Sequence, residues 1–166
     1  MDVDLQELKA RLGRPARRRM LAVAESMTGG RLQARLTEIS GASDFFLGGL
    51  TAYTLEQKVG LLAVDREHAA AVNCVSARVA EEMAVGVRRL FGADYGVATT
   101  GYAEPAPAQG VAVPFAWVAV AAGAPDGSVA VRSRRVEVPG STRAEAQARV
   151  AEAAVRELWA FLREEG

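Results

Sequence analysis

The chain has 166 residues, with 20 basic and 20 acidic side chains, and this length suits one domain, residues 1–166, with a sizeable core. The balanced charge gives no sign of a nucleic-acid or anionic-membrane partner, so we expect a small-molecule ligand and no direct nucleic-acid or membrane binding. The single cysteine, Cys74, excludes an intramolecular disulfide, and neither a signal peptide nor a run of about 18 apolar residues is found. We therefore expect a reducing, cytoplasmic location.

The first half of the chain alternates helical and extended patterns. Leu5, Leu8 and Leu12 have helical spacing, and Gly13 and Pro15 end that pattern. In chain order, the patterns predict a helix over 4–12, a short strand ending near Glu25, a helix over 29–39, a strand within 41–54 and a short helix over 55–64.

The second half contains the clearest helix signals. Ser76 is a plausible N-cap and Gly92 suits a left-handed end, which predicts a helix between them. A buried strand over 93–101, a proline-rich loop over 102–110, and two strands joined by an Asp-Gly turn at 126–127 follow. Pro114 predicts an edge position or an irregular entry for the first of these two strands. Thr142 and Glu145 have capping-box spacing before an amphipathic helix over 143–165.

Strands and helices thus alternate along most of the chain, with one hairpin near the end. This order is typical of a three-layer α/β/α domain around a mixed, mostly parallel sheet. We find no internal repeat and no linker long enough to divide the chain.

The turn after the first strand is the first candidate site. In α/β sheets, ligands bind beyond the carboxyl ends of the strands, and Ser26 lies at such an end, next to Glu25. Gly29 and Gly30 remove side chains where N–H groups of the next helix would point outward. The turn therefore predicts a phosphate cradle or an oxyanion hole, with a helix cap as the structural alternative for Ser26.

A serine nucleophile requires a base. His68 is the sole histidine, in a charged segment where a surface position explains it as well. Of the two lysines, Lys9 lies on a polar helix face, whereas Lys58 follows a predicted strand, with Tyr53 five residues before it. A neutral Lys58 would take the proton of Ser26, and the Tyr53 hydroxyl would orient the amine or a substrate. A solvated helix residue is the alternative for Lys58.

Residues 24–64 and 75–101 resemble the CinA C-terminal domain family, whose members include nicotinamide mononucleotide deamidases. The family pattern Ala-Glu-Ser-Cys-Thr-Gly-Gly stands here as Ala24 to Gly30 with Met27 in place of cysteine, and the family's tyrosine-to-lysine segment stands as Tyr53 to Lys58. The resemblance implies hydrolysis of nicotinamide mononucleotide to nicotinic acid mononucleotide and ammonia, in pyridine nucleotide salvage. It implies no metal and no organic cofactor. Ser26 would be the nucleophile, Lys58 its base and Tyr53 a positioning neighbour; the implied substrate contacts are Glu25, Thr28, Gly29, Gly30, Thr100, Gly101 and Arg143.

The chain departs from the family pattern in the 102–115 loop. Glu104 stands where the family has a glycine, and the glycine pair that follows is absent. A carboxylate here would obstruct or repel a phosphate that a glycine admits. The Gly-Asp-Arg before the last helix is also altered, leaving Arg143 either as a phosphate contact or as a surface arginine beside the capping box.

Two alternatives to nicotinamide mononucleotide deamidation follow from these departures. The first is a related hydrolase whose loop has shifted it to another amide. The second is a catalytically inactive domain that acts as a ligand-binding or protein-interaction module. A homodimer through the edge strand or the last helix is a further expectation that the sequence leaves open.

Overall fold

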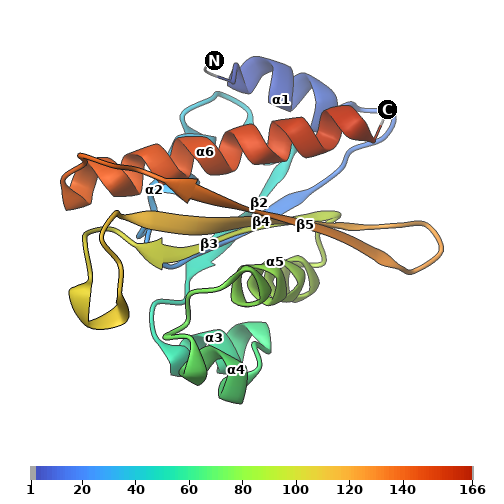
Figure 1. Ribbon diagram of the computed structural model, residues 1–166. Helices are drawn as coiled ribbons and strands as arrows, with labels where there is room; N and C mark the ends of the chain where they lie inside the picture. The colour runs from blue at the N-terminus through green and yellow to red at the C-terminus, as the bar shows by residue number, and fades with distance from the viewer. Residues whose placement is uncertain (1–2, 166) are drawn as a thin grey trace.

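The computed structural model describes residues 3–165 as alternating helices and strands (Figure 1). The first half contains α1 (Leu5–Leu12), β1 (Leu21–Glu25), α2 (Arg31–Thr37), β2 (Phe46–Thr51), α3 (Leu55–Leu62) and α4 (Arg66–Ala71). The second half contains α5 (Ala77–Phe91), β3 (Tyr95–Tyr102), β4 (Phe115–Gly123), β5 (Val129–Glu137) and α6 (Arg143–Glu164). Short 3-10 turns occur at Ala42–Asp44 and Pro107–Gln109.

The five strands form one mixed sheet in the order β2-β1-β3-β4-β5. β1 pairs in parallel with both β2 and β3, whereas β3–β4 and β4–β5 are antiparallel. Four strands therefore point the same way and only β4 runs against them, which confirms the expected mixed, mostly parallel sheet. Pro114 precedes β4, an internal strand, so the irregular-entry interpretation of this proline holds and the edge interpretation is wrong.

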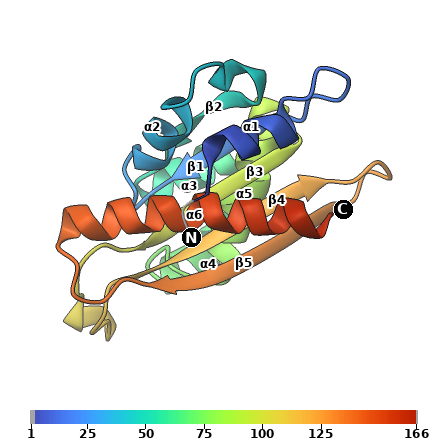
Figure 2. The same cartoon turned by 90° about the horizontal axis from the view of Figure 1, so that it is seen from above.

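Helices cover both faces of the sheet, as expected for three layers (Figure 1). α1, α2 and α6 lie on one face, where Figure 2 shows α6 running along the sheet beside α1 and α2. α3, α4 and α5 lie on the other face. No helix within residues 3–165 is both long and apolar enough to cross a membrane.

Alternate residues of the strands enter two separate cores. In β1, Leu21 and Val23 belong to the core under α1, α2 and α6, while Ala22 and Ala24 belong to the core under α5. The alanine-rich side brings α5 close to the sheet, and a Cβ on Gly96 would lie only 2.0 Å from the Ala84 carbonyl oxygen. Small side chains on this face thus set the distance between α5 and β3.

The helix ends that were predicted from capping residues are confirmed in α5 and α6. The Ser76 hydroxyl accepts from the Val79 N–H, and Gly92 ends α5 with a φ of 62°. Thr142 forms a complete capping box with Glu145 at the start of α6. Because β1, β2 and β3 are parallel, their carboxyl ends meet at one edge of the sheet, where the turn after β1 lies.

Candidate active site

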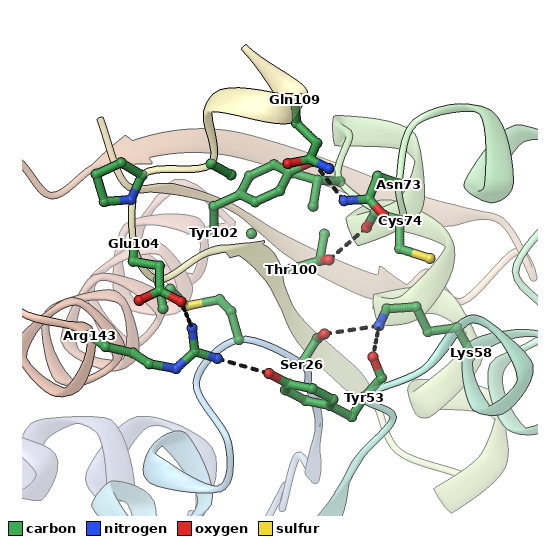
Figure 3. Close-up of a pocket in the computed structure, with 16 residues that line it drawn as sticks. Ser26, Tyr53, Lys58, Asn73, Cys74, Thr100, Tyr102, Glu104, Gln109 and Arg143 are labelled. Atoms are coloured by element: carbon green, nitrogen blue, oxygen red, sulfur yellow. Dashed lines mark hydrogen bonds and ion pairs between the residues drawn. The ribbon is translucent and has the colours of Figure 1, made fainter. Parts of the chain in front are cut away.

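Ser26 and Lys58 meet at this edge of the sheet (Figure 3). The Nζ of Lys58 lies 2.9 Å from the Oγ of Ser26, although the two residues are 32 positions apart in the chain. The same Nζ also donates to the carbonyl oxygens of Ala52, at 2.8 Å, and Tyr53, at 3.0 Å. These contacts fix the amine against the serine hydroxyl.

The pair is buried, with an exposed fraction of 7% for Ser26 and 1% for Lys58. The pKa of Lys58 lies below its ordinary value of 10.5 because burial disfavours the charged ammonium, while the electrostatic effect of the neighbouring Cys74 acts more weakly in the opposite direction. Within residues 3–165 no carboxylate is hydrogen-bonded to this amine or forms an ion pair with it. Burial therefore shifts the equilibrium of this amine toward its neutral form, which is the form that accepts a proton.

A cavity of about 310 Å³ opens over the pair. It brings together six residues that the sequence identified as site residues: Ser26, Tyr53, Lys58, Thr100, Gly101 and Arg143. It also contains residues that the sequence did not single out as site residues, among them Asn73, Tyr102 and Gln109. The segment between α4 and α5 carried no sequence signal for a site, yet Asn73 and Cys74 have left-handed φ angles of 50° and 61° that turn this segment into the cavity wall.

The Thr100 side chain holds this wall in place. Its Oγ1 donates to the carbonyl oxygen of Cys74 at 2.7 Å, which ties β3 to the turn before α5. The Asn73 amide donates to the Tyr102 hydroxyl at 3.1 Å. Cys74 is half-buried beside these contacts. Thr100 therefore shapes the cavity through a backbone contact.

Glu25 was expected to contact the substrate, but it does not line the cavity. Its carboxylate is fully buried and accepts from the Thr28 hydroxyl at 2.6 Å and from the N–H groups of Gly30, Leu32 and Gln33 at 2.9–3.0 Å. An internal anion thus caps the N-terminus of α2. The N–H groups at this end are already used by the protein.

The expected cradle over residues 28–30 is therefore corrected. Thr28 is fully buried, and its hydroxyl lies 2.8 Å from that of Thr99. The Gly29 N–H donates to the Ser26 carbonyl, and the Gly30 N–H donates to Glu25. Neither these glycines nor Thr28 lines the cavity. Within residues 3–165, the N–H groups of Met27 and Thr28 donate to no protein acceptor, which leaves them as the donors nearest to Ser26 in sequence.

Arg143 reaches the cavity from the first turn of α6 (Figure 3). Its guanidinium donates through Nη1 to the Glu104 carboxylate at 2.7 Å and through Nη2 to the Tyr53 hydroxyl at 3.0 Å. The Tyr53 hydroxyl therefore contacts Arg143, while the Tyr53 backbone carbonyl holds Lys58. The tyrosine joins the two ends of the site.

The other candidates lie elsewhere. The His68 ring is hydrogen-bonded to Ser76 at 2.9 Å, and His68 does not line the cavity. Lys9 forms an ion pair with Asp44 at 3.4 Å and does not line the cavity. Met27, in place of the cysteine of the family pattern, is 4% exposed and belongs to the core while also lining the cavity.

Fold and site together define a three-layer α/β domain that holds a lysine-paired serine in a cavity at the carboxyl ends of its parallel strands. The chain belongs to the CinA C-terminal domain family, whose model matches residues 5–162.

Curated relatives carry the same family name. The chain is 44% identical over 145 residues to a CinA-like protein of Chlorobium limicola, covering 87% of this chain and 34% of that protein. It is 48% identical over 120 residues to a CinA-like protein of Frankia casuarinae, covering 72% of this chain and 27% of that protein. The chain thus spans about a third or less of the length of these relatives.

Solved structures share the fold over nearly the whole chain. A competence-damaged protein (CinA) superfamily protein from Enterobacter cloacae is 28% identical, with a TM-score of 0.83 and coverage of 95% of this chain and 89% of that one. A competence/damage inducible protein from Agrobacterium tumefaciens is 30% identical, with a TM-score of 0.75 and coverage of 97% and 96%. The family assignment and the α/β fold that the sequence predicted are therefore confirmed.

Proposed function

We propose that this protein is an amidohydrolase that converts nicotinamide mononucleotide to nicotinic acid mononucleotide and ammonia through a Ser26–Lys58 pair. The observation that carries the proposal is the 2.9 Å contact between the Ser26 hydroxyl and the Lys58 amine at the buried end of the cavity. The chain's membership of the CinA C-terminal domain family supports the same activity, because the sequence resembles deamidases of that family.

Three oxygen atoms surround the Lys58 amine, and an ammonium can donate to all three, but burial lowers the pKa of Lys58 and so shifts it toward the neutral form. A neutral amine has two N–H donors and one lone pair, whereas an ammonium has three donors and no acceptor. The carbonyl oxygens of Ala52 and Tyr53 take up two N–H groups, which directs the lone pair of the neutral form toward the Ser26 hydroxyl. Lys58 is then a general base held ready for the serine proton.

The proposed reaction has two stages. In the first, Ser26 Oγ attacks the carboxamide carbon, its proton passes to Lys58, and the tetrahedral intermediate collapses to an acyl-serine as Lys58 returns the proton to the leaving ammonia. In the second, Lys58 takes a proton from water, the hydroxide attacks the acyl carbon, Ser26 leaves as Lys58 returns that proton to its oxygen, and the carboxylic acid product loses its own proton to solvent. The N–H group of Met27, a residue that lines the cavity, is the candidate donor for the oxyanion.

Ammonia release from nicotinamide mononucleotide tests the proposal, with Ser26→Ala as the variant. We expect release from the unmodified protein and none above background from Ser26→Ala. Ser40→Ala, at an exposed position outside the cavity, is the matched control and should keep full turnover. Denaturing mass spectrometry of the unmodified protein during turnover should detect an acyl adduct on the peptide that contains Ser26.

The ligand-binding alternative is favoured by one observation, the carboxylate of Glu104 beside Arg143. Ammonia release, measured together with binding of nicotinamide mononucleotide, separates the two functions. Saturable binding of nicotinamide mononucleotide by a folded protein that releases no ammonia would replace the hydrolase by a binding module.

A further inference from the structure

Three hydrogen-bonded side chains lie at the mouth of the cavity: Arg143 donates to both Glu104 and Tyr53. Figure 3 shows Glu104 and Arg143 on one side of the cavity and Lys58 on the other. Both members of the ion pair are partly exposed, with side-chain exposures of 60% for Glu104 and 48% for Arg143. The pair therefore lies where the distal end of a bound substrate would leave the cavity.

The position of the guanidinium is set from three sides. Arg143 is the first residue of α6, directly after the capping box at Thr142. Glu104 holds one terminal nitrogen and the Tyr53 hydroxyl holds the other. These two contacts use two of the five N–H groups of the guanidinium, so an incoming anion must share the arginine with the Glu104 carboxylate.

The cavity wall offers an anion little other positive charge. Among the described residues that line it, the charged types are Lys58, Glu104 and Arg143. Burial favours the neutral form of Lys58, and the charges of Glu104 and Arg143 cancel. The N-terminus of α2, which would otherwise attract a phosphate, is already capped by Glu25.

These contacts affect the two ends of a nicotinamide nucleotide in opposite ways. A 5′-phosphate must compete with the Glu104 carboxylate for Arg143 and remains close to that carboxylate, which repels it. A 5′-hydroxyl carries no charge for the Glu104 carboxylate to repel, and it can donate a hydrogen bond to that carboxylate. The pyridinium ring, which is a cation, is attracted to a carboxylate in either ligand.

We infer that Glu104 is a specificity-determining residue, and that it allows this site to take the dephosphorylated nicotinamide nucleoside about as readily as the mononucleotide. The inference rests on the proposed function for the type of substrate. It rests on the Glu104–Arg143–Tyr53 contacts for the preference between the two substrates.

The test measures binding by calorimetry in the Ser26→Ala protein, so that it does not depend on turnover. We expect the affinities for nicotinamide mononucleotide and for its nucleoside to agree within about tenfold, because the charges at the mouth cancel. In Ser26→Ala/Glu104→Gln, the affinity for the mononucleotide should rise on the order of tenfold relative to the nucleoside. Glu56→Gln, which removes a carboxylate from another exposed pair with Arg66 outside the cavity, should leave the ratio unchanged.

Two results would overturn the inference: a preference for the mononucleotide above about a hundredfold with Glu104 in place, or a ratio that Glu104→Gln does not change. Failure to bind either ligand would also overturn it. Ammonia release with a Ser26-intact protein is measured separately. A Glu104-dependent ratio without ammonia release would contradict the proposed function alone, whereas ammonia release with an unchanged ratio would contradict the specificity inference alone.

Discussion

Replacing Lys58 by methionine is the sharpest perturbation of the candidate active site. Methionine keeps an unbranched apolar chain in a position that is 1% exposed, so the core volume changes little. The change removes the amine that lies 2.9 Å from the Ser26 hydroxyl. The variant therefore separates the chemical role of Lys58 from its packing.

The expected loss follows from the role of a general base. Loss of a positioned base costs roughly 10²–10⁴-fold in rate. The only other histidine or lysine side chains, His68 and Lys9, do not line the cavity. We expect kcat for ammonia release to fall by at least about a hundredfold, with little change in KM.

The lowered pKa of Lys58 also predicts how the activity depends on pH. At the ordinary pKa of 10.5, only about 0.03% of a lysine is neutral at pH 7, and each unit by which burial lowers the pKa raises that fraction about tenfold. The unmodified protein should therefore show kcat/KM rising with pH and levelling off below 10.5. The residual activity of Lys58→Met should lack this rise.

Two controls make the result interpretable. Lys9→Met removes the other lysine of the chain, which pairs with Asp44 away from the cavity, and should keep full activity. Thermal unfolding checks that Lys58→Met is folded. A folded Lys58→Met protein that retains more than about a tenth of kcat would refute the serine–lysine mechanism.

Three further predictions concern stability. Because burial lowers the pKa of Lys58, the folded protein binds fewer protons than the unfolded chain at pH values between the lowered pKa and 10.5. The free energy of unfolding of the unmodified protein, measured relative to that of Lys58→Met, should therefore rise as pH increases through this range. If urea titrations show no change in the difference between the two proteins, the pKa argument is contradicted. Glu25→Gln should lower the free energy of unfolding by at least about 2 kcal/mol, because the carboxylate accepts three backbone N–H groups in the interior; a loss below about 0.5 kcal/mol in chemical denaturation would show that this cap matters little. Gly86→Ala should cost about 1–3 kcal/mol, since its Cβ would lie 2.2 Å from the Leu62 carbonyl oxygen. The matched Gly60→Ala change meets open space in α3 and should stabilise by up to about 1 kcal/mol, so equal effects of the two changes would contradict the packing argument.

The order of helices and strands, apart from the short helix α4, could be predicted from the sequence because it depends on local signals. Ser76 and Gly92 mark the ends of α5 with a hydroxyl cap and a left-handed glycine, and the Thr142–Glu145 spacing marks the start of α6. The strand, turn and helix around Ser26 were equally readable, since periodicity and glycine placement act within a few residues. The family resemblance had the same source, a dense run of residues in one segment.

The meeting of residues from separate segments was decided by the tertiary structure. Ser26 and Lys58 come together because β1 and β2 pair in parallel and the chain after each strand turns at the same edge. The roles of Glu25 and Tyr53 also depended on the fold: the carboxylate turns inward to the N–H groups of α2, and the tyrosine divides its contacts between its carbonyl and its hydroxyl. Spacing along the chain carries no information on such directions.

The sequence by itself thus determined the helices, the strands, the family and the candidate nucleophile and base, because each of these depends on short-range pattern. Only the tertiary structure decided which N–H groups remained open to a ligand, and that Glu104 would pair with Arg143 across 39 positions of the chain. The Glu104–Arg143 contact depends on α6 beginning close to the loop that follows β3, and long-range packing of this kind fixes the charge that a substrate meets.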